Sequence, residues 1–297
     1  MEAFQLKRGR IVRLLGLAAR LLGRNGVDSP GREAEGLYCA ALSLPRHAIY
    51  SDRAEAPGRS DLQRFRAFLR RRAKREPFAY ITGTREFYKH RFRVRPGVLI
   101  PRPETEELVE IALSETSGSL QVLDLCAGSG AIGISYLLER PDCRLVLADL
   151  SRDALTIAEE NCAELAPTLK ERIQIVGGDL YGALDARQTF DLIFCNPPYI
   201  HPDEAGSLEP EVLHHEPAEA LFHADPPGLY RRIVKGATNH LKEDGLLLVE
   251  LSPRWDSTVL ALARDCFARA ELRRDRGGQP RILIARRPLQ RSETQRT

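Results

Sequence analysis

The sequence lacks several features that would define whole classes of protein. No apolar run approaches the roughly 20 residues that a membrane-spanning helix needs. The six cysteines stand singly with no CxxC pair, which argues against a disulfide framework or zinc site and favours a reducing, cytoplasmic compartment. Among seven histidines, His214 and His215 are adjacent rather than at ligand spacing, so no metal centre is predicted. Internal repeats and low-complexity segments are also missing.

Acidic residues are scarce near the N-terminus, which makes the charge uneven along the chain. Residues 1–76 hold 17 Lys and Arg against 8 Asp and Glu, whereas the remainder holds 27 against 33. An Arg-rich start is typical of an organellar transit peptide. The first 26 residues contain no Ser, however, and their apolar positions repeat at helical spacing, so a folded helix is favoured. A basic front end suggests an acidic or nucleic-acid partner, and a solvated helix face is the alternative.

Apolar stripes at helical spacing predict three or more short helices in residues 1–76. The stripes comprise Ile11, Leu14, Leu15, Ala18, Ala19 and Leu22; Ala34, Leu37, Tyr38, Ala41 and Leu42, ended by Pro45; and Leu62, Phe65, Phe68 and Leu69, opened by Asp61. Burying them against one another predicts a small helical bundle. Its outward cations include Arg66, Arg70, Arg71 and Lys74.

The segment 77–100 is predicted to link this bundle to a second domain. Pro77 ends the helical region, and strand-like alternation at 87–88 and 92–94, around a turn near 89–91, predicts a β-hairpin. The proline-stiffened stretch 100–106 then leads into a helix whose first turn is acidic.

From residue 120 the pattern alternates strands and helices, which predicts a doubly wound, Rossmann-like α/β domain over 101–290. Seven strands are expected at 120–125, 144–148, 173–176, 191–195, 246–251, 270–274 and 282–285. No helix separates the last two, so the final strand is predicted to be antiparallel. Residues 291–297 are expected to form a frayed tail.

The first strand ends at Asp124-Leu125 and runs into a glycine-containing turn, 126–130, that feeds a helix. Gly128 and Gly130 allow a ligand to approach the backbone at a helix N-terminus. With Gly133 they also fit the GxGxxG spacing of dinucleotide sites, so the turn alone indicates only nucleotide binding.

Acidic residues follow the second and third strands. Asp149 lies 21 residues after Gly128, where a carboxylate accepts hydrogen bonds from a ribose diol; alternatively it caps the next helix with Ser151. Asp179 and Leu180 fit an adenine pocket, with the carboxylate accepting from an exocyclic amine. An ordinary loop aspartate is the alternative.

The tetrapeptide Asn196-Pro197-Pro198-Tyr199 follows the fourth strand. Each proline lacks a ladder donor and has a fixed φ, so the strand must stop, and Asn196 is kept out of helical geometry. Its amide is therefore presented where open α/β sheets bind ligands. With Asp149 and Asp179, the pattern resembles the class I S-adenosylmethionine-dependent methyltransferases.

The tetrapeptide is similar to those of enzymes that methylate a planar nitrogen, either an adenine amino group or a glutamine amide. Such a nitrogen is a poor nucleophile because its lone pair is delocalised. We expect the Asn196 side-chain oxygen and the Pro197 carbonyl to accept from its two N–H bonds, and Tyr199 to pack over the planar group. Positioning and electrostatics then govern transfer, without a metal or a dedicated nucleophile.

Further segments resemble the release factor glutamine N5-methyltransferases over nearly the whole chain. They are residues 76–83, 86–88, 98–106, 216–221 and 244–246, with Glu250. The stretch 100–106 is the specific one, because ribosomal-protein glutamine methyltransferases differ there. The resemblance implies a helical N-terminal domain, a hairpin linker and a Rossmann-like catalytic domain. It also implies a substrate, the glutamine of the Gly-Gly-Gln loop of peptide chain release factors.

The resemblance further implies roles for individual residues. S-adenosylmethionine is expected at Cys126, Ala127, Gly128, Ser129, Gly130, Asp149, Asp179, Leu180 and Asn196. The substrate is expected at Arg102, Asn196, Pro197, Pro198 and Tyr199, of which Asn196, Pro197 and Tyr199 are the predicted catalytic residues.

Three residues depart from the family pattern. Cys126 stands where the family usually has Gly, and Ser252 and Trp255 stand where Gly and Gln are expected after Glu250. The tripeptide Gly277-Gly278-Gln279 spells the release factor's own motif, but it lies between two predicted strands and is interpreted as a turn.

Two other classes of function stay open on the sequence. An adenine N6-methyltransferase needs a basic cleft beside the tetrapeptide to hold a flipped base, whereas the catalytic half is net acidic, so nucleic acid is not the expected substrate. A nucleic-acid-binding module with a dead fold would not need Asp149, Asp179 and Asn196 intact.

Overall fold

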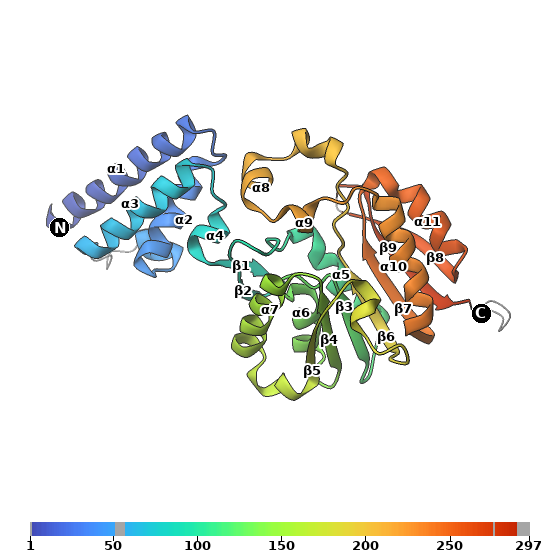
Figure 1. Ribbon diagram of the computed structural model, residues 1–297. Coiled ribbons are helices and arrows are strands. Elements are labelled where there is room, and N and C mark those ends of the chain that lie inside the picture. Colours follow the sequence, from blue (N-terminus) through green and yellow to red (C-terminus); the bar gives the residue numbers. More distant parts are fainter. Residues whose placement is uncertain (1, 51–56, 276, 290–297) are drawn as a thin grey trace. The chain divides into compact units, whose positions relative to one another are not determined.

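The computed structural model describes residues 2–50, 57–275 and 277–289, with side chains from residue 11 onward. The predicted tail, 291–297, lies outside these ranges. The chain forms two compact units (Figure 1). The first comprises Met1–Gly83 and Glu209–His215, and the second comprises Thr84–Leu208 and Glu216–Thr297.

The first unit is a helical bundle. Its helices are α1 (Glu2–Arg24), α2 (Pro30–Leu42), α3 (Arg59–Ala73), α4 (Phe78–Thr82) and α8 (Pro210–His215), with a 3-10 turn at Arg46–Tyr50. The predicted stripes of α1, α2 and α3 are buried together, with Leu22, Leu37 and Phe65 fully enclosed. The Tyr38 and Phe65 rings meet edge to face at 5.3 Å between centroids. The sequence did not predict α8, which comes from far along the chain.

Arg72 ties α8 into this bundle. Its side chain is only 7% exposed, and it donates to Glu33 of α2 at 2.8 Å and to Glu211 of α8 at 2.9 Å. Arg75 adds a second ion pair to Glu211 at 2.5 Å. Removing one partner of a buried ion pair leaves the others without compensation, so this guanidinium stabilises the unit chiefly by matching two carboxylates.

Replacing Arg72 with methionine should therefore destabilise the bundle by about 3 kcal/mol, because Glu33 and Glu211 then lose a buried counter-charge. Native-state hydrogen exchange of α2 and α3 amides in the full chain measures this locally. Arg70→Met is the matched control, since Arg70 is exposed on the same helix, and it should change the stability by less than about 0.5 kcal/mol. Equal protection in the two variants would contradict the assigned role.

A β-hairpin opens the second unit. Strands β1 (Thr84–Phe87) and β2 (His90–Arg93) pair antiparallel, and Tyr88 and Lys89 turn between them with φ of 41° and 67°. Two consecutive positive φ values belong to the tight hairpin turns that match strand twist. The predicted hairpin is confirmed, although its turn begins earlier than the predicted 89–91.

The second unit is built on a seven-stranded sheet in the order β5-β4-β3-β6-β7-β9-β8. The strands are β3 (Gln121–Leu125), β4 (Arg144–Asp149), β5 (Ile173–Gly177), β6 (Phe190–Cys195), β7 (Leu241–Glu250), β8 (Phe267–Arg274) and β9 (Pro280–Pro288). The first five are parallel, and β9 inserts antiparallel between β7 and β8. The predicted fold, including the antiparallel last strand, is confirmed.

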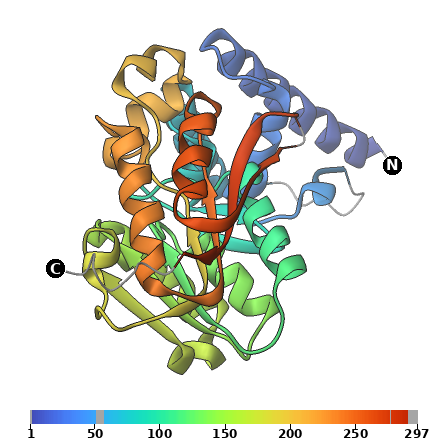
Figure 2. The same cartoon turned by 90° about the vertical axis from the view of Figure 1, so that its right-hand side faces the viewer.

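Helices cover both faces of the sheet (Figures 1 and 2). On one face pack α5 (Glu106–Glu115), α6 (Ala131–Glu139) and α7 (Arg152–Leu165); on the other pack α10 (Pro226–His240) and α11 (Asp256–Arg264). Alternate strand residues serve the two layers, so Leu192 and Phe194 face the first and Ile193 and Cys195 face the second. The described helices include none that is long and apolar enough to cross a membrane.

Short turns complete the second unit. They are α9 (Ala218–Leu221) and 3-10 turns at Pro103–Thr105, Pro167–Arg172, Leu180–Ala183, Pro202–Ser207 and Pro253–Trp255. Because Leu125 pairs with both Ala148 and Cys195, the segments that follow β3, β4 and β6 emerge side by side. Parallel strands place their carboxyl ends at one edge, and that edge holds the predicted site residues.

Candidate functional site

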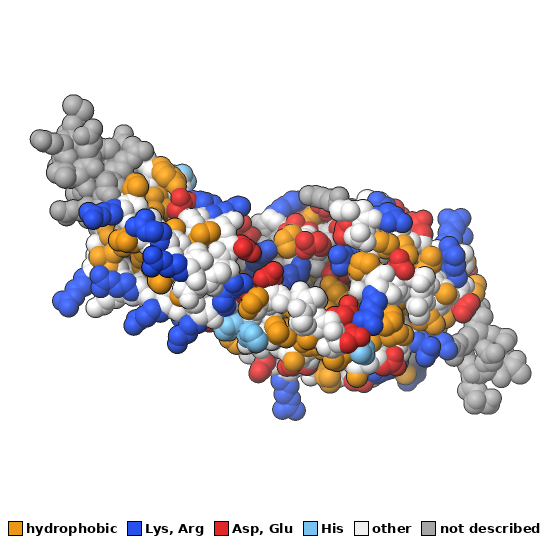
Figure 3. Space-filling model, turned by 90° about the horizontal axis from the view of Figure 1, so that it is seen from above, with side chains coloured by type: hydrophobic (Ala, Val, Ile, Leu, Met, Phe, Trp, Pro, Cys, Tyr) orange, Lys and Arg blue, Asp and Glu red, His pale blue; other side chains and the backbone are white. Residues whose placement is uncertain are grey.

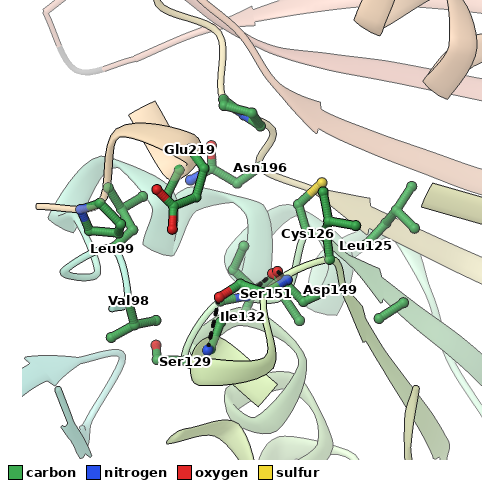
Figure 4. Close-up of a pocket in the computed structure, with 18 of the residues that line it drawn as sticks. Val98, Leu99, Leu125, Cys126, Ser129, Ile132, Asp149, Ser151, Asn196 and Glu219 are labelled. Atoms are coloured by element: carbon green, nitrogen blue, oxygen red, sulfur yellow. Dashed lines mark hydrogen bonds between the residues drawn. The ribbon is translucent and has the colours of Figure 1, made fainter. Parts of the chain in front are cut away.

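A cavity of about 660 Å³ opens at the carboxyl edge of the sheet. This volume lies within the range of about 300–1,000 Å³ usual for small-molecule sites. Strand ends and two loops, 97–105 and 217–223, line it. In Figure 4, Asn196 and Glu219 approach the cavity from one side, and Asp149, Ser151 and Ser129 approach it from the other.

Asp149 joins the end of β4 to the turn after β3. One carboxylate oxygen accepts from the Gly128 N–H and the other from the Ser151 N–H, each at 2.8 Å. Ser151 itself caps α7 by accepting from Ala154 N. Burial raises the pKa of Asp149, and the two backbone donors oppose that rise. The carboxylate therefore has a local structural role and also lines the cavity.

The turn after β3 brings backbone close to the cavity. Cys126 has φ +60° and Gly128 has φ +56°, and both line the space, as do Ala127 and Ser129. A left-handed non-glycine residue costs about 1–2 kcal/mol, so the surrounding structure must hold Cys126 in place. Gly130 also has a positive φ but starts α6 behind the cavity and does not line it.

Asn161 of α7 supports this turn from behind. Its side chain is buried, donates to the Ser129 carbonyl at 2.9 Å, and accepts from Arg93 N at 2.7 Å. One amide thus connects the hairpin strand β2 to the glycine turn. Sequence reasoning missed Asn161, because a polar residue within a helical stretch gives no signal of what it will contact.

Asp124 lies beneath the same turn and is completely buried. One carboxylate oxygen accepts from Gly133 N at 2.8 Å, whereas Oδ1 has no hydrogen-bond partner among the described residues. Burial raises the pKa of Asp124 to about 7. The folded state therefore binds a proton that the unfolded chain releases near pH 4.

The difference between the folded and unfolded pKa of Asp124 predicts how the free energy of unfolding changes with pH. Between the unfolded and folded pKa values the native state binds more protons, so the free energy of unfolding falls as pH rises. Asp124→Asn removes that titration, and its stability relative to the native sequence should improve by about 3 kcal/mol between pH 5 and pH 8. Urea denaturation at the two pH values measures it; a stability difference that does not change with pH would contradict the buried carboxyl's role.

Asp179 and Leu180 follow β5 and both line the cavity. Leu180 is buried with φ +50°, which makes it a second left-handed non-glycine residue of the site. The Asp179 carboxylate is half exposed and accepts from Arg232 of α10 at 2.6 Å. Arg232 also lines the cavity, although no sequence pattern predicted it.

The tetrapeptide after β6 contributes unequally to the cavity. Asn196 and Pro198 line it, whereas Pro197 and Tyr199 do not. The Tyr199 hydroxyl instead donates to Glu250 Oε1 at 3.1 Å, and burial raises the pKa of Tyr199, so it stays protonated near neutral pH.

Two hydrogen bonds link Asn196 through Thr105 to Glu250. Asn196 Nδ2 donates to Thr105 Oγ1 at 3.4 Å, and Thr105 donates to Glu250 Oε2 at 2.7 Å. Thr105 and Glu250 are both almost fully buried. Glu250 ends β7, and its predecessor Val249 pairs with Cys195, so the sheet register places Glu250 beside Asn196.

Arg102 lies in the proline-stiffened loop and lines the cavity. It donates to Glu216 Oε1 at 2.5 Å, and the other oxygen of this buried carboxylate accepts from Ile100 N at 3.0 Å. Glu216 thereby fixes the Arg102 loop through two hydrogen bonds to residues that are distant in the sequence. The structure brings all the sequence-predicted residues to one edge, and it adds Thr105, Glu219 and Arg232 to the cavity wall.

The remaining sequence features lie away from the cavity lining. Ser252 caps the 3-10 turn before α11, and the Trp255 ring stacks under Arg254 at 4.8 Å from its centroid. Gly277, Gly278 and Gln279 lie in the β8–β9 connection, where Asp275 N donates to the Gln279 carbonyl. Within the described ranges, no group of three His, Cys, Asp or Glu residues could hold a metal ion.

Two family profiles match the chain. The one described as PrmC N-terminal domain matches residues 13–83, and the one described as methyltransferase small domain matches residues 105–272. A solved structure of the T. thermophilus 16S rRNA N2 G1207 methyltransferase, in complex with AdoMet and guanosine, is similar in fold. It has a TM-score of 0.50 at 18% identity over 69% of this chain and 49% of that chain.

Curated relatives cover most of the chain. A release factor glutamine methyltransferase of Leptospira interrogans is 34% identical over 93% of this chain and 98% of the relative. Those of Cereibacter sphaeroides and Geobacter sulfurreducens are each 37% identical, over 90% and 89% of this chain and 95% and 92% of the relatives.

Proposed function

The chain belongs to the release factor glutamine methyltransferases, and we propose that it methylates the side-chain amide nitrogen of the glutamine in the Gly-Gly-Gln motif of peptide chain release factors. The methyl donor is S-adenosylmethionine and the compartment is the cytoplasm. The observation that carries this proposal is the placement of Asn196 in the wall of the same cavity as Asp149.

The cavity has the features that S-adenosylmethionine needs. Asp149 offers a carboxylate for ribose hydroxyls, and Leu180 gives an apolar surface for the purine. The left-handed turn at Cys126–Gly128 exposes backbone rather than side chain to the amino acid part of the cofactor. Asp179 is available to an exocyclic amine once it shares or leaves its pairing with Arg232.

The tetrapeptide supplies what a planar nitrogen requires. S-adenosylmethionine provides an electrophilic methyl group when bound, but an amide nitrogen is weakly nucleophilic because its lone pair is delocalised. The proposed acceptors for the two N–H bonds are the Asn196 Oδ1, in the cavity wall, and the carbonyl of the next residue, Pro197, which is not part of the lining. Accepting from both N–H bonds raises the electron density on nitrogen and fixes its orientation. Preorganised dipoles of this kind act without reorganisation cost in a water-poor site. Tyr199, held by Glu250, supports the turn from behind.

Asn196→Ala should abolish methyl transfer while S-adenosylmethionine binding changes little. Loss of one preorganised hydrogen-bonding group typically costs about 10²–10³ in kcat. Transfer of labelled methyl groups to a purified release factor measures the first effect, and calorimetric titration measures the second. A near-normal rate would eliminate the acceptor mechanism, and transfer to DNA but not to a release factor would favour an adenine substrate.

The basic bundle is proposed to dock the release factor. Figure 3 shows Lys and Arg side chains spread over the bundle, at the left of the view. Arg66, Arg70 and Lys74 of the α3 region are exposed, and no ion pair forms with them in the described parts of the chain. Arg71 differs from these three because it is paired with Glu76. Unpaired surface cations steer an acidic partner and contribute to its affinity.

Reversing the charge of Arg66, Arg70 and Lys74 together should raise KM for the release factor by about tenfold, because three exposed charge pairs contribute roughly 0.2–1 kcal/mol each. The kcat should stay near its native value, since such contacts hold ground state and transition state alike.

A matched control reverses Arg144, Lys170 and Arg187. These are also exposed: Arg144 begins β4, and Lys170 and Arg187 precede β5 and β6, all at the sheet edge opposite the cavity. This triple variant should leave KM unchanged. If both triple variants raised KM equally, the effect of α3 would come from the net charge of the protein and not from docking. An unaltered KM in the first triple variant would contradict the docking role.

A further inference from the structure

Asn196 can serve as an acceptor only if its amide oxygen, rather than its amide nitrogen, faces the substrate. The two orientations of an asparagine amide differ by a half-turn and occupy the same volume, so packing does not distinguish them. The choice must come from a neighbour with a fixed hydrogen-bonding polarity. Such a neighbour is found at Thr105, in the turn before α5.

The polarity of the Thr105 hydroxyl is set by Glu250. A hydroxyl has one proton to donate, and Thr105 donates it to Glu250 Oε2 at 2.7 Å. Glu250 Oε1 accepts from the Tyr199 hydroxyl at 3.1 Å. Burial raises the pKa of Glu250, while the hydrogen bonds from Thr105 and Tyr199 and the charge of Arg281 oppose that rise; the ionised form accepts at both oxygens. Thr105 is left with lone pairs only, so it accepts from Asn196 Nδ2 and could not pair with Oδ1.

We propose that Thr105 and Glu250 are positioning residues that fix the orientation of the Asn196 side-chain amide, so that its oxygen faces the substrate nitrogen. The inference rests on the proposed function for the identity of the substrate. The chain of contacts runs from the Glu250 carboxylate to the Thr105 hydroxyl to the Asn196 amide, and both of the first two groups are almost wholly buried.

Burial makes this hydrogen-bond relay, from Glu250 through Thr105 to Asn196, specific. Bulk water has little access to Thr105 and Glu250, because these residues are only 3% and 2% exposed. A buried polar group without its partner is destabilising, so the alternative amide orientation, which sets two acceptors against each other, is disfavoured. Tyr199 and Thr105 share one carboxylate, so Glu250 also couples the end of the tetrapeptide to its beginning.

Thr105→Val and Thr105→Ser form a matched pair that tests the relay. Valine keeps the shape and removes the hydroxyl, whereas serine keeps the hydroxyl. We expect Thr105→Val to lower kcat by about 10- to 100-fold, since small misplacements at a reacting centre have effects of this size. KM for S-adenosylmethionine should change less than twofold, and Thr105→Ser should restore kcat to within about threefold. If Thr105 had a structural role alone, the kcat of each variant would fall only in proportion to its loss of stability.

Glu250→Gln provides a second variant in which the hydroxyl remains but its polarity is no longer fixed. Its amide donates to one of the two hydroxyls, so kcat should fall as in Thr105→Val, and the double variant should be no slower than the slower single variant. A native kcat in both Thr105→Val and Glu250→Gln would overturn the inference, as would additive losses in the double variant.

Nuclear magnetic resonance gives a readout that does not depend on the substrate. The chain has four asparagines, so selective ¹⁵N labelling resolves their side-chain NH₂ groups, and Asn196→Ala identifies the relevant pair. In the native protein and Thr105→Ser, the Asn196 NH₂ protons should exchange slowly with water; in Thr105→Val they should exchange at least tenfold faster. The Asn25 NH₂, exposed and bonded to Leu21 O, is the internal reference.

The two proposals fail in different ways. A native enzyme that transfers no methyl group to release factors defeats the proposed function, and the exchange measurement still decides the orientation of Asn196. An active native enzyme whose Asn196 NH₂ protons exchange equally fast with and without the Thr105 hydroxyl defeats the relay alone.

Discussion

The parallel pairing of β6 with β3 on one side and β7 on the other is the constraint on which the site depends. Cys195 pairs with Leu125 and with Val249, so Asn196, Cys126 and Glu250 leave three neighbouring strands at one level. Parallel strands buried on both faces cannot shift by one residue without exchanging their two layers of apolar side chains. The two hydrophobic layers thereby fix where the polar residues of the site emerge.

The two prolines determine where β6 ends. Pro197 and Pro198 carry no backbone N–H, so β6 ends at Cys195 and Asn196 lies beyond the strand. Around them, three acidic side chains accept hydrogen bonds from other segments of the unit. Asp149 holds the glycine turn, Glu216 holds the Arg102 loop, and Glu250 holds Thr105 and Tyr199. Each acid joins segments that are distant in sequence.

Sequence patterns predicted the strands, the two helical layers and the strand ends that carry Asp149, Asp179 and Asn196, because each depends on local spacing. They did not predict that β9 inserts between β7 and β8, since strand order depends on contacts between distant residues. They also did not predict that α8 packs in the bundle through Arg72. The roles of Thr105 and Asn161 could not be predicted, because the residues next to a polar side chain in the sequence do not indicate which distant group it will bind. The roles of the predicted site residues stay predictions.

We propose that this site methylates one amide nitrogen of a protein. Tandem mass spectrometry of a release factor, after incubation with the native enzyme and S-adenosylmethionine carrying a heavy methyl group, tests it most directly. We expect a single heavy methyl group on the side chain of the glutamine in the Gly-Gly-Gln motif, and none when Asn196 is replaced by alanine. A methyl group on another residue, or on a DNA adenine supplied in the same reaction, would contradict it.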